Sequence, residues 1–200
     1  LGPLSHLVIA GDDLRRIDAK RAADIGDSGS CNIDLACTNP STALTQAGDA
    51  VGKLLFNDRS GSTFLCSGTM LNDSVTSFTP YLFTAAHCIE DAFNAGTVNV
   101  YWFFRALSCG STAVPPYALQ TGGSMLLARS ADYDWAMLRL YTSPPAGVRY
   151  SAWRGEPVPA NAIGTALHHP GGDLLKWSQG SMLGYYTFDD GSSFMQMRWS

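Results

Sequence analysis

The chain has 200 residues, of which 46% are hydrophobic and 15% charged, and its formal net charge is −4. That length allows one large domain or two small ones, and the apolar content is typical of a globular protein. Its basic pairs are Arg15-Arg16 and Lys20-Arg21, so nucleic-acid binding is not indicated. The sequence holds no apolar run of membrane-spanning length and opens with no signal peptide, so we expect the chain to begin after any export signal.

The first 25 residues differ in character from the rest. A short strand is predicted over Leu4–Ile9, and a charged helix over Asp12–Arg21 with Asp12 as its cap. From Val51 onward the sequence changes to short apolar or alternating runs separated by turn residues, which predicts strands.

These predicted strands fall into two groups. The first group is Val51–Asn57, Thr63–Leu71, Thr79–Thr84, Thr97–Arg105, Ser124–Ala128 and Trp135–Tyr141. Residues 57–62 (Asn-Asp-Arg-Ser-Gly-Ser) form a turn-rich hairpin connection, and residues 143–147 (Ser-Pro-Pro-Ala-Gly) form a linker. The second group is Ala162–His168, Leu174–Tyr186 and Ser193–Trp199. Short strands at this spacing predict an all-β barrel or sandwich.

Two motifs carry the predicted chemistry. Residues 82–88 read Leu-Phe-Thr-Ala-Ala-His-Cys, so a buried strand ends in two small residues before His87. Residues 132–140 read Asp-Tyr-Asp-Trp-Ala-Met-Leu-Arg-Leu, in which an acid opens a largely apolar strand. Histidine titrates near neutral pH and suits a general base, and a buried carboxylate that accepts from its Nδ1–H fixes the tautomer. We interpret His87 as the base and Asp134 as the acid, with Asp132 as the competitor for the acid's role.

Five cysteines in a compact chain predict an oxidising compartment. Clustered cysteines can also indicate a metal-binding site. The chain has no CxxC pair, however, and five residues separate Cys31 from Cys37. We therefore predict disulfides and neither a metal nor a cofactor, and the odd count leaves one thiol without a partner.

These motifs resemble the trypsin-like serine endopeptidases. Residues 64–71 (Phe-Leu-Cys-Ser-Gly-Thr-Met-Leu), followed by Thr-Ala-Ala-His-Cys, look like the first barrel of such a protease. His before Asp is the chain order of chymotrypsin-type enzymes, in which the nucleophilic Ser comes third. Residues 29–34 (Gly-Ser-Cys-Asn-Ile-Asp) and 166–170 (Ala-Leu-His-His-Pro) narrow the resemblance to the bacterial secreted branch that contains the lysyl endopeptidases. The resemblance covers roughly residues 26–200.

The resemblance implies a chymotrypsin-like double antiparallel β-barrel. Its first barrel would be complete over residues 26–142, and residues 143–200 would form a linker and an incomplete second barrel. Residues 1–25 are then the tail of a pro-segment, or a linker without a role of its own. The catalytic Ser is expected beyond residue 200, in a C-terminal part that this chain lacks.

The resemblance also implies the disulfides Cys66–Cys88 and Cys37–Cys109. Cys31 would pair with a cysteine late in the complete protein. The unpaired cysteine and the missing Ser would then both be explained by the absence of the C-terminal part from this chain. In lysyl members a Trp beside the catalytic His helps to shape the active site. Counting back from Trp199 places that position near Tyr186, so the resemblance does not by itself imply a strict preference for lysine.

Two further motifs could be interpreted as catalytic. Residues 26–30 (Gly-Asp-Ser-Gly-Ser) imitate the loop that carries the nucleophile in trypsin-like enzymes. They precede His87, whereas in the resembled fold the Ser follows the Asp, so we interpret them as a turn near a processing point and not as a nucleophile at Ser28. We interpret His168 and His169 as structural residues at the boundary between a strand and a turn.

The sequence therefore predicts a fragment of a secreted or periplasmic serine endopeptidase. It would hydrolyse peptide bonds through an acyl-enzyme and act on proteins or peptides, with no nucleic acid, membrane or cofactor as partner. The C-terminal half or the pro-segment is the expected partner, and the fragment itself is predicted to be inactive. Three alternatives stay open: a non-catalytic homologue that acts as a binding module, one chain of a two-chain protease, and a metallohydrolase built on His87, His168 and His169.

Overall fold

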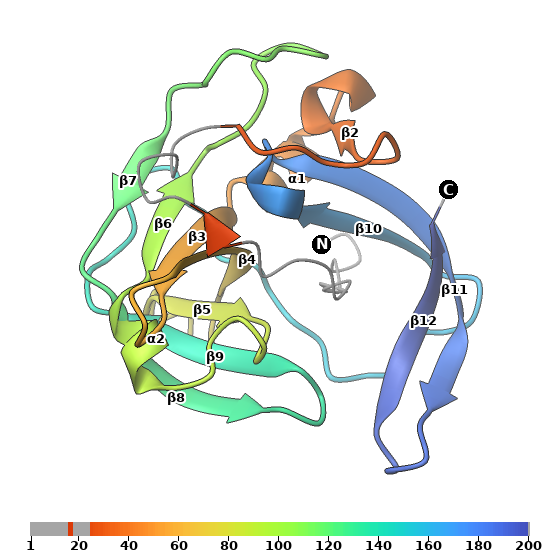
Figure 1. Ribbon diagram of the computed structural model, residues 1–200. Coiled ribbons are helices and arrows are strands. Elements are labelled where there is room, and N and C mark those ends of the chain that lie inside the picture. The colour runs from red at the N-terminus through yellow and green to blue at the C-terminus, as the bar shows by residue number, and fades with distance from the viewer. Residues whose placement is uncertain (1–15, 18–24, 200) are drawn as a thin grey trace.

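The computed structural model describes residues 16–17 and 25–199, and its strands form two antiparallel sheets (Figure 1). The first sheet has the order β7-β6-β3-β4-β5-β9-β8, with β1 paired to β4. Its strands are β1 (Arg16–Ile17), β3 (Val51–Asn57), β4 (Thr63–Leu71), β5 (Tyr81–Thr84), β6 (Asn99–Trp102), β7 (Ala118–Gln120), β8 (Ser124–Ser130) and β9 (Trp135–Leu140). Within the described residues no ladder joins its edge strands β7 and β8; in Figure 1 the sheet curls round a common interior.

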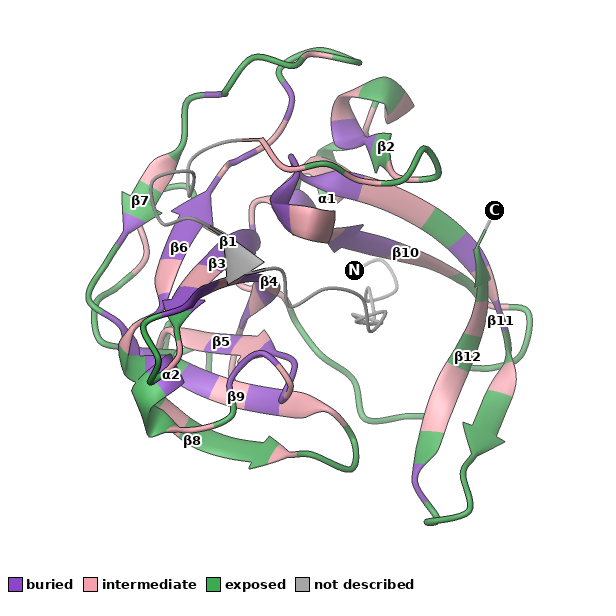
Figure 2. Ribbon diagram, in the orientation of Figure 1, coloured by how far each residue is buried: buried purple, intermediate pink, exposed green. Residues whose placement is uncertain are grey.

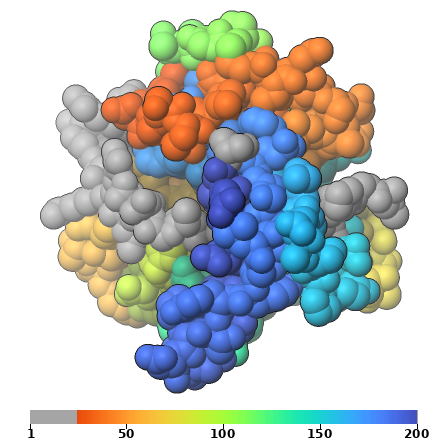
Figure 3. All heavy atoms as spheres, turned by 90° about the vertical axis from the view of Figure 1, so that its right-hand side faces the viewer, coloured from red at the N-terminus to blue at the C-terminus, as the bar shows by residue number. Residues whose placement is uncertain are grey.

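The second sheet has the order β10-β11-β12, with β2 paired to β11. Its strands are β2 (Ile33–Asp34), β10 (Ile163–His168), β11 (Lys176–Thr187) and β12 (Ser193–Trp199). In the part of the chain that the structure describes, β12 pairs with β11 alone and forms the edge of the sheet. Figure 3 shows the β11–β12 hairpin (blue) lying across one face of the molecule, with its tip projecting from the body.

The interior of the first sheet follows from the alternation in its strands. In β9 the residues Ala136, Leu138 and Leu140 are buried, while the residues between them are half-buried or exposed. Side chains alternate across a strand, so one face of β9 packs on the core and the other faces outward. Figure 2 shows many buried residues in β3, β6 and β9, whereas the residues of the β11–β12 hairpin are mostly intermediate or exposed. This core fixes the ends of β5 and β9, where the predicted site residues lie.

The predicted hairpin between β3 and β4 is present. Asp58 Oδ1 accepts hydrogen bonds from the backbone N–H groups of Ser60 and Ser62, at 2.9 and 2.8 Å, and Gly61 has a φ of 82°. An aspartate that binds the backbone two residues on is a common way to close a tight turn, and glycine accepts the positive φ. The strands β3, β4 and β12 begin and end at the residues that the sequence predicts.

Helices are few among the described residues, and none of those present was predicted. They are α1 (Thr42–Gly48), α2 (Ala92–Gly96) and the 3-10 turns Leu35–Thr38 and Pro170–Gly172. Asp91 caps α2 in a capping box with Asn94, and Ser41 caps α1. No helix among the described residues is long and apolar enough to cross a membrane.

The helix predicted over Asp12–Arg21 is wrong where it can be checked. Arg16 and Ile17 form strand β1, which pairs with Phe64 and Thr63 of β4. A short charged helix is marginal in water, whereas the end of β4 offers backbone hydrogen bonds to a passing segment. The rest of that prediction, and the strand predicted over Leu4–Ile9, lie outside the described residues.

The two sheets meet at the loop between β10 and β11. The backbone N–H of His169 in this loop donates to Ser67 Oγ of β4 at 2.8 Å. The ammonium of Lys176 in β11 pairs with Asp34 at 2.6 Å and with Asp173 at 3.2 Å, and all three residues are buried. Burial tends to lower the pKa of Lys176, but its hydrogen bonds to the two carboxylates outweigh this effect and raise the pKa.

Candidate active site

The chain before His87 is built from small buried residues. Leu82 and Thr84 of β5 point into the core, and Ala85 and Ala86 follow with exposures of 0% and 1%. These two alanines turn inside a packed region where a larger side chain has no room. His87 comes directly after the turn, and 33% of its side chain remains exposed. The imidazole is therefore fixed at its base and open at its end.

Two links hold this turn to β4. Before the histidine, Thr84 Oγ1 donates to the carbonyl oxygen of Ser67 at 2.8 Å. After it, Cys88 forms a disulfide with Cys66, with their Cα atoms 6.4 Å apart. The predicted Cys66–Cys88 pairing is thus confirmed. His87 lies between two anchors on neighbouring residues of one strand.

Asp134 contacts His87 through both carboxylate oxygens. Oδ2 lies 2.7 Å from His87 Nδ1, and Oδ1 accepts from the backbone N–H of His87 at 2.9 Å. A carboxylate beside Nδ1 requires a proton on that nitrogen, which leaves Nε2 as the acceptor in the neutral ring. The second hydrogen bond prevents the carboxylate from rotating. Asp134 therefore fixes both the tautomer and the orientation of the imidazole.

A turn before β9 brings Asp134 to this position. Its backbone N–H donates to the carbonyl oxygen of Ala131 at 3.3 Å, and its φ is +48°. Aspartate is one of the few residue types besides glycine that adopt such a φ readily. Asp132 lies in the same turn and is exposed, and the contact with His87 is made by Asp134.

A β-bulge in β8 brings a cation to the same corner. The β8–β9 register shifts between Leu126 and Ala128, so Arg129 lies opposite Ala136. Since residues opposite one another share a face, the extra residue moves Arg129 to the face of the buried Ala136. Its Nη2 atom is 3.4 Å from the carbonyl oxygen of Ala86. Sequence reasoning missed this contact, because a bulge leaves no clear signal in a strand of this composition.

A cleft of about 1270 Å³ borders Asp134. It lies between the outward face of β5 and β9 and the β11–β12 hairpin, and is lined mainly by apolar side chains that include Phe83, Trp135 and Phe194. The rings of Phe83 and Trp135 stack with their centroids 6.5 Å apart. The ring of Tyr186 packs against Phe188 further along the hairpin.

Within the described chain, His168 and His169 do not join His87 in a cluster of possible metal ligands. Among the described residues, the group of metal-ligand side chains that contains His87 holds Cys66 and Cys88 and neither His168 nor His169. His169 is buried; its Nδ1 lies 3.0 Å from the Asp173 carbonyl oxygen, and its Nε2 has no hydrogen-bond partner within the described residues. Burial lowers the pKa of His169 to about 3, so the ring is neutral.

The Ser28 hydroxyl is engaged elsewhere. It donates to Asp173 Oδ2 at 2.6 Å, and the backbone N–H of Gly26 donates to the Gly172 carbonyl oxygen at 3.2 Å. A Cβ on Gly26 would lie 2.1 Å from the Gly171 carbonyl oxygen, so glycine is needed for this close approach. The segment 26–28 is thus docked on the loop between β10 and β11.

The second predicted disulfide is also present. Cys37 and Cys109 are bonded, with their Cα atoms 4.5 Å apart. Cys31 is a free, exposed thiol within this chain, in agreement with the expectation that it is the odd cysteine.

Comparison with known sequences finds the same group of proteins that the motifs indicate. The sequence model of the lysyl endopeptidase C-terminal domain family matches residues 25–200. The lysyl endopeptidase of Pseudomonas aeruginosa is 35% identical over 181 residues, which make up 87% of this chain and 39% of that protein. The chain therefore spans less than half the length of this curated relative.

Solved structures agree on the fold. An HtrA-type protease, AlgW with a tripeptide, superposes with a TM-score of 0.54 at 17% identity, over 78% of this chain and 46% of that one. The active form of the Rv3671c protease from M. tuberculosis has a TM-score of 0.52 at 15% identity, over 88% of this chain and 67% of that one. The fold is mostly β and antiparallel, of the chymotrypsin-like protease class. With the family match over residues 25–200, the chain belongs to the lysyl endopeptidase C-terminal domain family.

Proposed function

We propose that this chain carries the general base and the orienting acid of a serine endopeptidase. The observation that supports it is the double contact of Asp134 with His87, at 2.7 Å to Nδ1 and 2.9 Å to the backbone N–H. This arrangement leaves Nε2 free to take a proton, and the half-exposed ring gives a substrate access to it. In this proposal His87 is the base and Asp134 the acid, and Asp132 has no catalytic role.

The mechanism needs a hydroxyl, and no contact within the described residues brings one to His87 Nε2. We assign it to a Ser in sequence beyond residue 200. His87 Nε2 removes the proton from that hydroxyl as its oxygen attacks the peptide carbonyl, and later delivers the proton to the leaving amine. Asp134 stabilises the imidazolium that forms between the two steps. Backbone N–H groups near the Ser would bind the oxyanion.

The rest of the proposal concerns organisation and location. We assign residues 26–142 to the unit that carries the base and acid, residues 143–200 to a linker and part of a second unit, and residues 1–25 to a pro-segment tail. Two disulfides within the chain favour a secreted or periplasmic protein. Peptide substrates are supported by the relative, a lysyl endopeptidase, and by the neighbouring protease structure with a bound tripeptide.

The first experiment locates the nucleophile. We expect a fluorophosphonate probe to leave the 200-residue chain unlabelled, because Ser28 is held by Asp173. A version extended through the C-terminal part should be labelled at a Ser beyond residue 200, and His87→Ala should abolish this labelling. Labelling of the short chain at Ser28 would overturn the choice of nucleophile. An extended chain that folds and contains the Ser but is never labelled would favour a non-catalytic binding module.

The second experiment separates the two acids of one turn. In the extended enzyme, Asp134→Asn should lower kcat by about 10⁴-fold, because the amide does not favour the productive tautomer. Asp132→Asn is the matched control and should leave kcat nearly unchanged. In the short chain, the low-field proton resonance of the His87 Nδ1–H should vanish in Asp134→Asn and persist in Asp132→Asn. The reverse pattern would transfer the role to Asp132.

A further inference from the structure

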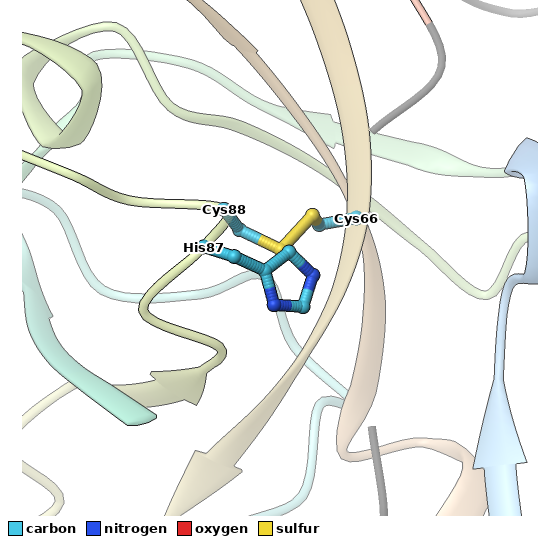
Figure 4. A group of neighbouring side chains, drawn as sticks. All are labelled: Cys66, His87 and Cys88. Carbon is cyan, nitrogen blue, oxygen red and sulfur yellow. A yellow bond between two sulfur atoms is a disulfide. The ribbon is translucent and has the colours of Figure 1, made fainter. Parts of the chain in front are cut away.

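The two residues of the candidate site are fixed in different ways. Figure 4 shows the imidazole of His87 beside the Cys66–Cys88 disulfide, so a covalent link holds the chain next to the histidine. Among the described residues, no disulfide reaches the turn that carries Asp134. The acid lies directly before β9 with a φ of +48°. A residue other than glycine keeps such a backbone only when its surroundings hold it there.

Two aromatic rings flank Asp134 and pack on different sheets. The ring of Trp135 stacks on Phe83 of β5, with their centroids 6.5 Å apart. The ring of Tyr133 packs on Phe194 of β12, with their centroids 6.1 Å apart. One neighbour of the acid is thus tied to the first sheet and the other to the second sheet.

Phe194 is itself held by two further rings of the hairpin. It meets the ring of Phe188 edge-on, with centroids 5.6 Å apart, and Phe188 meets Tyr186 in the same way at 4.8 Å. Aromatic pairs in such geometries contribute more than the area that they bury. The partner of Tyr133 is therefore part of a row of rings.

The hydrogen bonds inside the acid's turn are long. The backbone N–H groups of Tyr133 and Asp134 donate to Ser130 Oγ and to the Ala131 carbonyl oxygen, both at 3.3 Å. Most N–H donors in proteins lie about 2.9–3.0 Å from the oxygen that accepts their hydrogen bond. These two bonds hold the turn weakly, and the rings on either side of the acid add to them.

We propose that Tyr133 and Phe194 are positioning residues for Asp134. Their ring contact braces the acid's turn against the β11–β12 hairpin and so keeps the carboxylate on His87. Neither side chain needs to touch the substrate, because Tyr133 acts through the backbone that it shares with Asp134. The catalytic consequence rests on the proposed function, whereas the effect on the contact between Asp134 and His87 does not.

A direct role in substrate binding is the competing explanation. Tyr133 and Phe194 line the cleft that borders Asp134, so a bound peptide could meet them. Substrate binding alone would leave His87 unchanged in the protein without substrate. Positioning would alter the hydrogen bond between Asp134 and His87 before any substrate is present. The 200-residue chain therefore separates the two roles.

The first measurement is the exchange of the His87 Nδ1–H proton with water, followed by NMR saturation transfer in the 200-residue chain. Each opening of the acid's turn exposes this proton, so its exchange rate follows the population of the open turn. Tyr133→Ala and Phe194→Ala each remove the ring contact, and Tyr133→Phe keeps the ring. Tyr141→Ala is the matched control, because Tyr141 directly follows β9 at its other end and is similarly exposed, at 60% against 50% for Tyr133.

A buried proton in the same sheet reports whether the core stays intact. The indole N–H of Trp102 donates to Gln120 Oε1 at 2.8 Å, and this hydrogen bond is buried. Its exchange is measured in the same samples. Loosening of the whole sheet would raise the exchange of both protons, whereas release of the acid's turn would raise that of His87 alone.

We expect both alanine variants to raise the His87 exchange rate by about 3- to 10-fold, which is the range that an aromatic pair supplies. The double variant should exceed neither single variant by much, because the two residues share one contact. Tyr133→Phe and Tyr141→Ala should stay within about twofold of the unsubstituted chain, with Trp102 unchanged in all. Unchanged exchange in Tyr133→Ala, additive effects in the double variant, an equal rise in Tyr141→Ala or a parallel rise at Trp102 would overturn the proposal.

The second measurement uses the extended enzyme. Tyr133→Ala and Phe194→Ala should lower kcat by about 3- to 10-fold with KM nearly unchanged, and Tyr133→Phe should retain the full rate. A raised KM at unchanged kcat would assign the rings to substrate binding and overturn the proposal. An extended enzyme whose kcat does not depend on Asp134 would defeat the proposed function, and the exchange rates of the short chain would still decide the positioning role.

Discussion

The buried, neutral His169 should make the stability of this protein depend on pH. Its pKa is lowered by burial from 6.5 to about 3, against the opposing effect of the hydrogen bond to the Asp173 carbonyl. Lys53 and His168 lower it further. Between pH 6.5 and about pH 3, this histidine is protonated in the unfolded chain and neutral in the folded chain. Protonation therefore favours the unfolded state, and stability is lost as the pH falls through this range.

The size of the effect follows from the two pKa values. Full passage through the window corresponds to roughly 4–5 kcal/mol, at about 1.4 kcal/mol per pH unit. Over the accessible range from about pH 7 to about pH 4.5, the loss assigned to this one residue is roughly 2–3 kcal/mol. Burial of the ring is nearly complete, at 4% exposure, so solvent screening does not reduce this value much.

The comparison needs a variant that keeps the hydrogen bond and lacks the titration. In His169→Asn, the side-chain amide can still donate to the Asp173 carbonyl oxygen that now lies 3.0 Å from Nδ1. Free energies of unfolding would be measured by urea denaturation, followed by tryptophan fluorescence, across the pH range. His168 also has its pKa lowered by burial, but it is present in both proteins and cancels.

We expect the free-energy difference between the two proteins to change by roughly 2–3 kcal/mol in favour of His169→Asn as the pH falls to about 4.5. Parallel stability curves would show that His169 takes up a proton as easily in the folded state as in the unfolded one. The burial argument would then be wrong.

Two further predictions concern stability. Opening Cys37–Cys109, which closes 72 residues, should cost about 4.4 kcal/mol, and opening Cys66–Cys88, which closes 22, about 3.4 kcal/mol; denaturation of the two Cys→Ser double variants checks this, and the opposite ranking would exclude loop entropy as the main cause. Gly26→Ala should cost about 1–3 kcal/mol and release segment 26–28, because the new Cβ meets the Gly171 carbonyl oxygen at 2.1 Å. Gly29→Ala, with its nearest neighbour at 3.8 Å, is the matched control and should change stability by less than about 0.5 kcal/mol. Equal protease resistance of residues 26–28 in both variants would argue against docking of the segment.

Much of the first sheet could be predicted because its strands are short apolar or alternating runs separated by turn residues. The strand β3 is a nearly continuous buried run, burial in β9 alternates with the period of a strand, and a turn with Asp58 and Gly61 separates β3 from β4. Short elements gave no such pattern. The strand β7 has three residues and the helix α2 has five, so neither is long enough for a period to stand out.

Part of the candidate site could also be predicted from local sequence, and part could not. Small residues before His87 and an acid before an apolar strand are local signals, and both could be recognised in the sequence. The contacts of Ser67 with His169 and of Arg129 with Ala86 join residues 102 and 43 positions apart. One depends on how the sheets meet and the other on a bulge, so neither follows from local sequence. Asp134 is preferred to Asp132 in the sequence because it directly precedes the apolar strand, as the acid of the resembled family does. In the structure the left-handed backbone at Asp134 directs that side chain to the histidine.

The position of the two site residues in the first sheet also sets when they can meet during folding. His87 and Asp134 are 47 residues apart, and they are brought together by the ladder that pairs Thr84 with Ala136. Closing a loop of that length costs entropy before any contact repays it, so this ladder belongs to the slower events of folding. The hydrogen bond at His87 Nδ1 therefore forms only after β5 and β9 have paired. In refolding experiments its proton resonance would report the formation of the β5–β9 ladder.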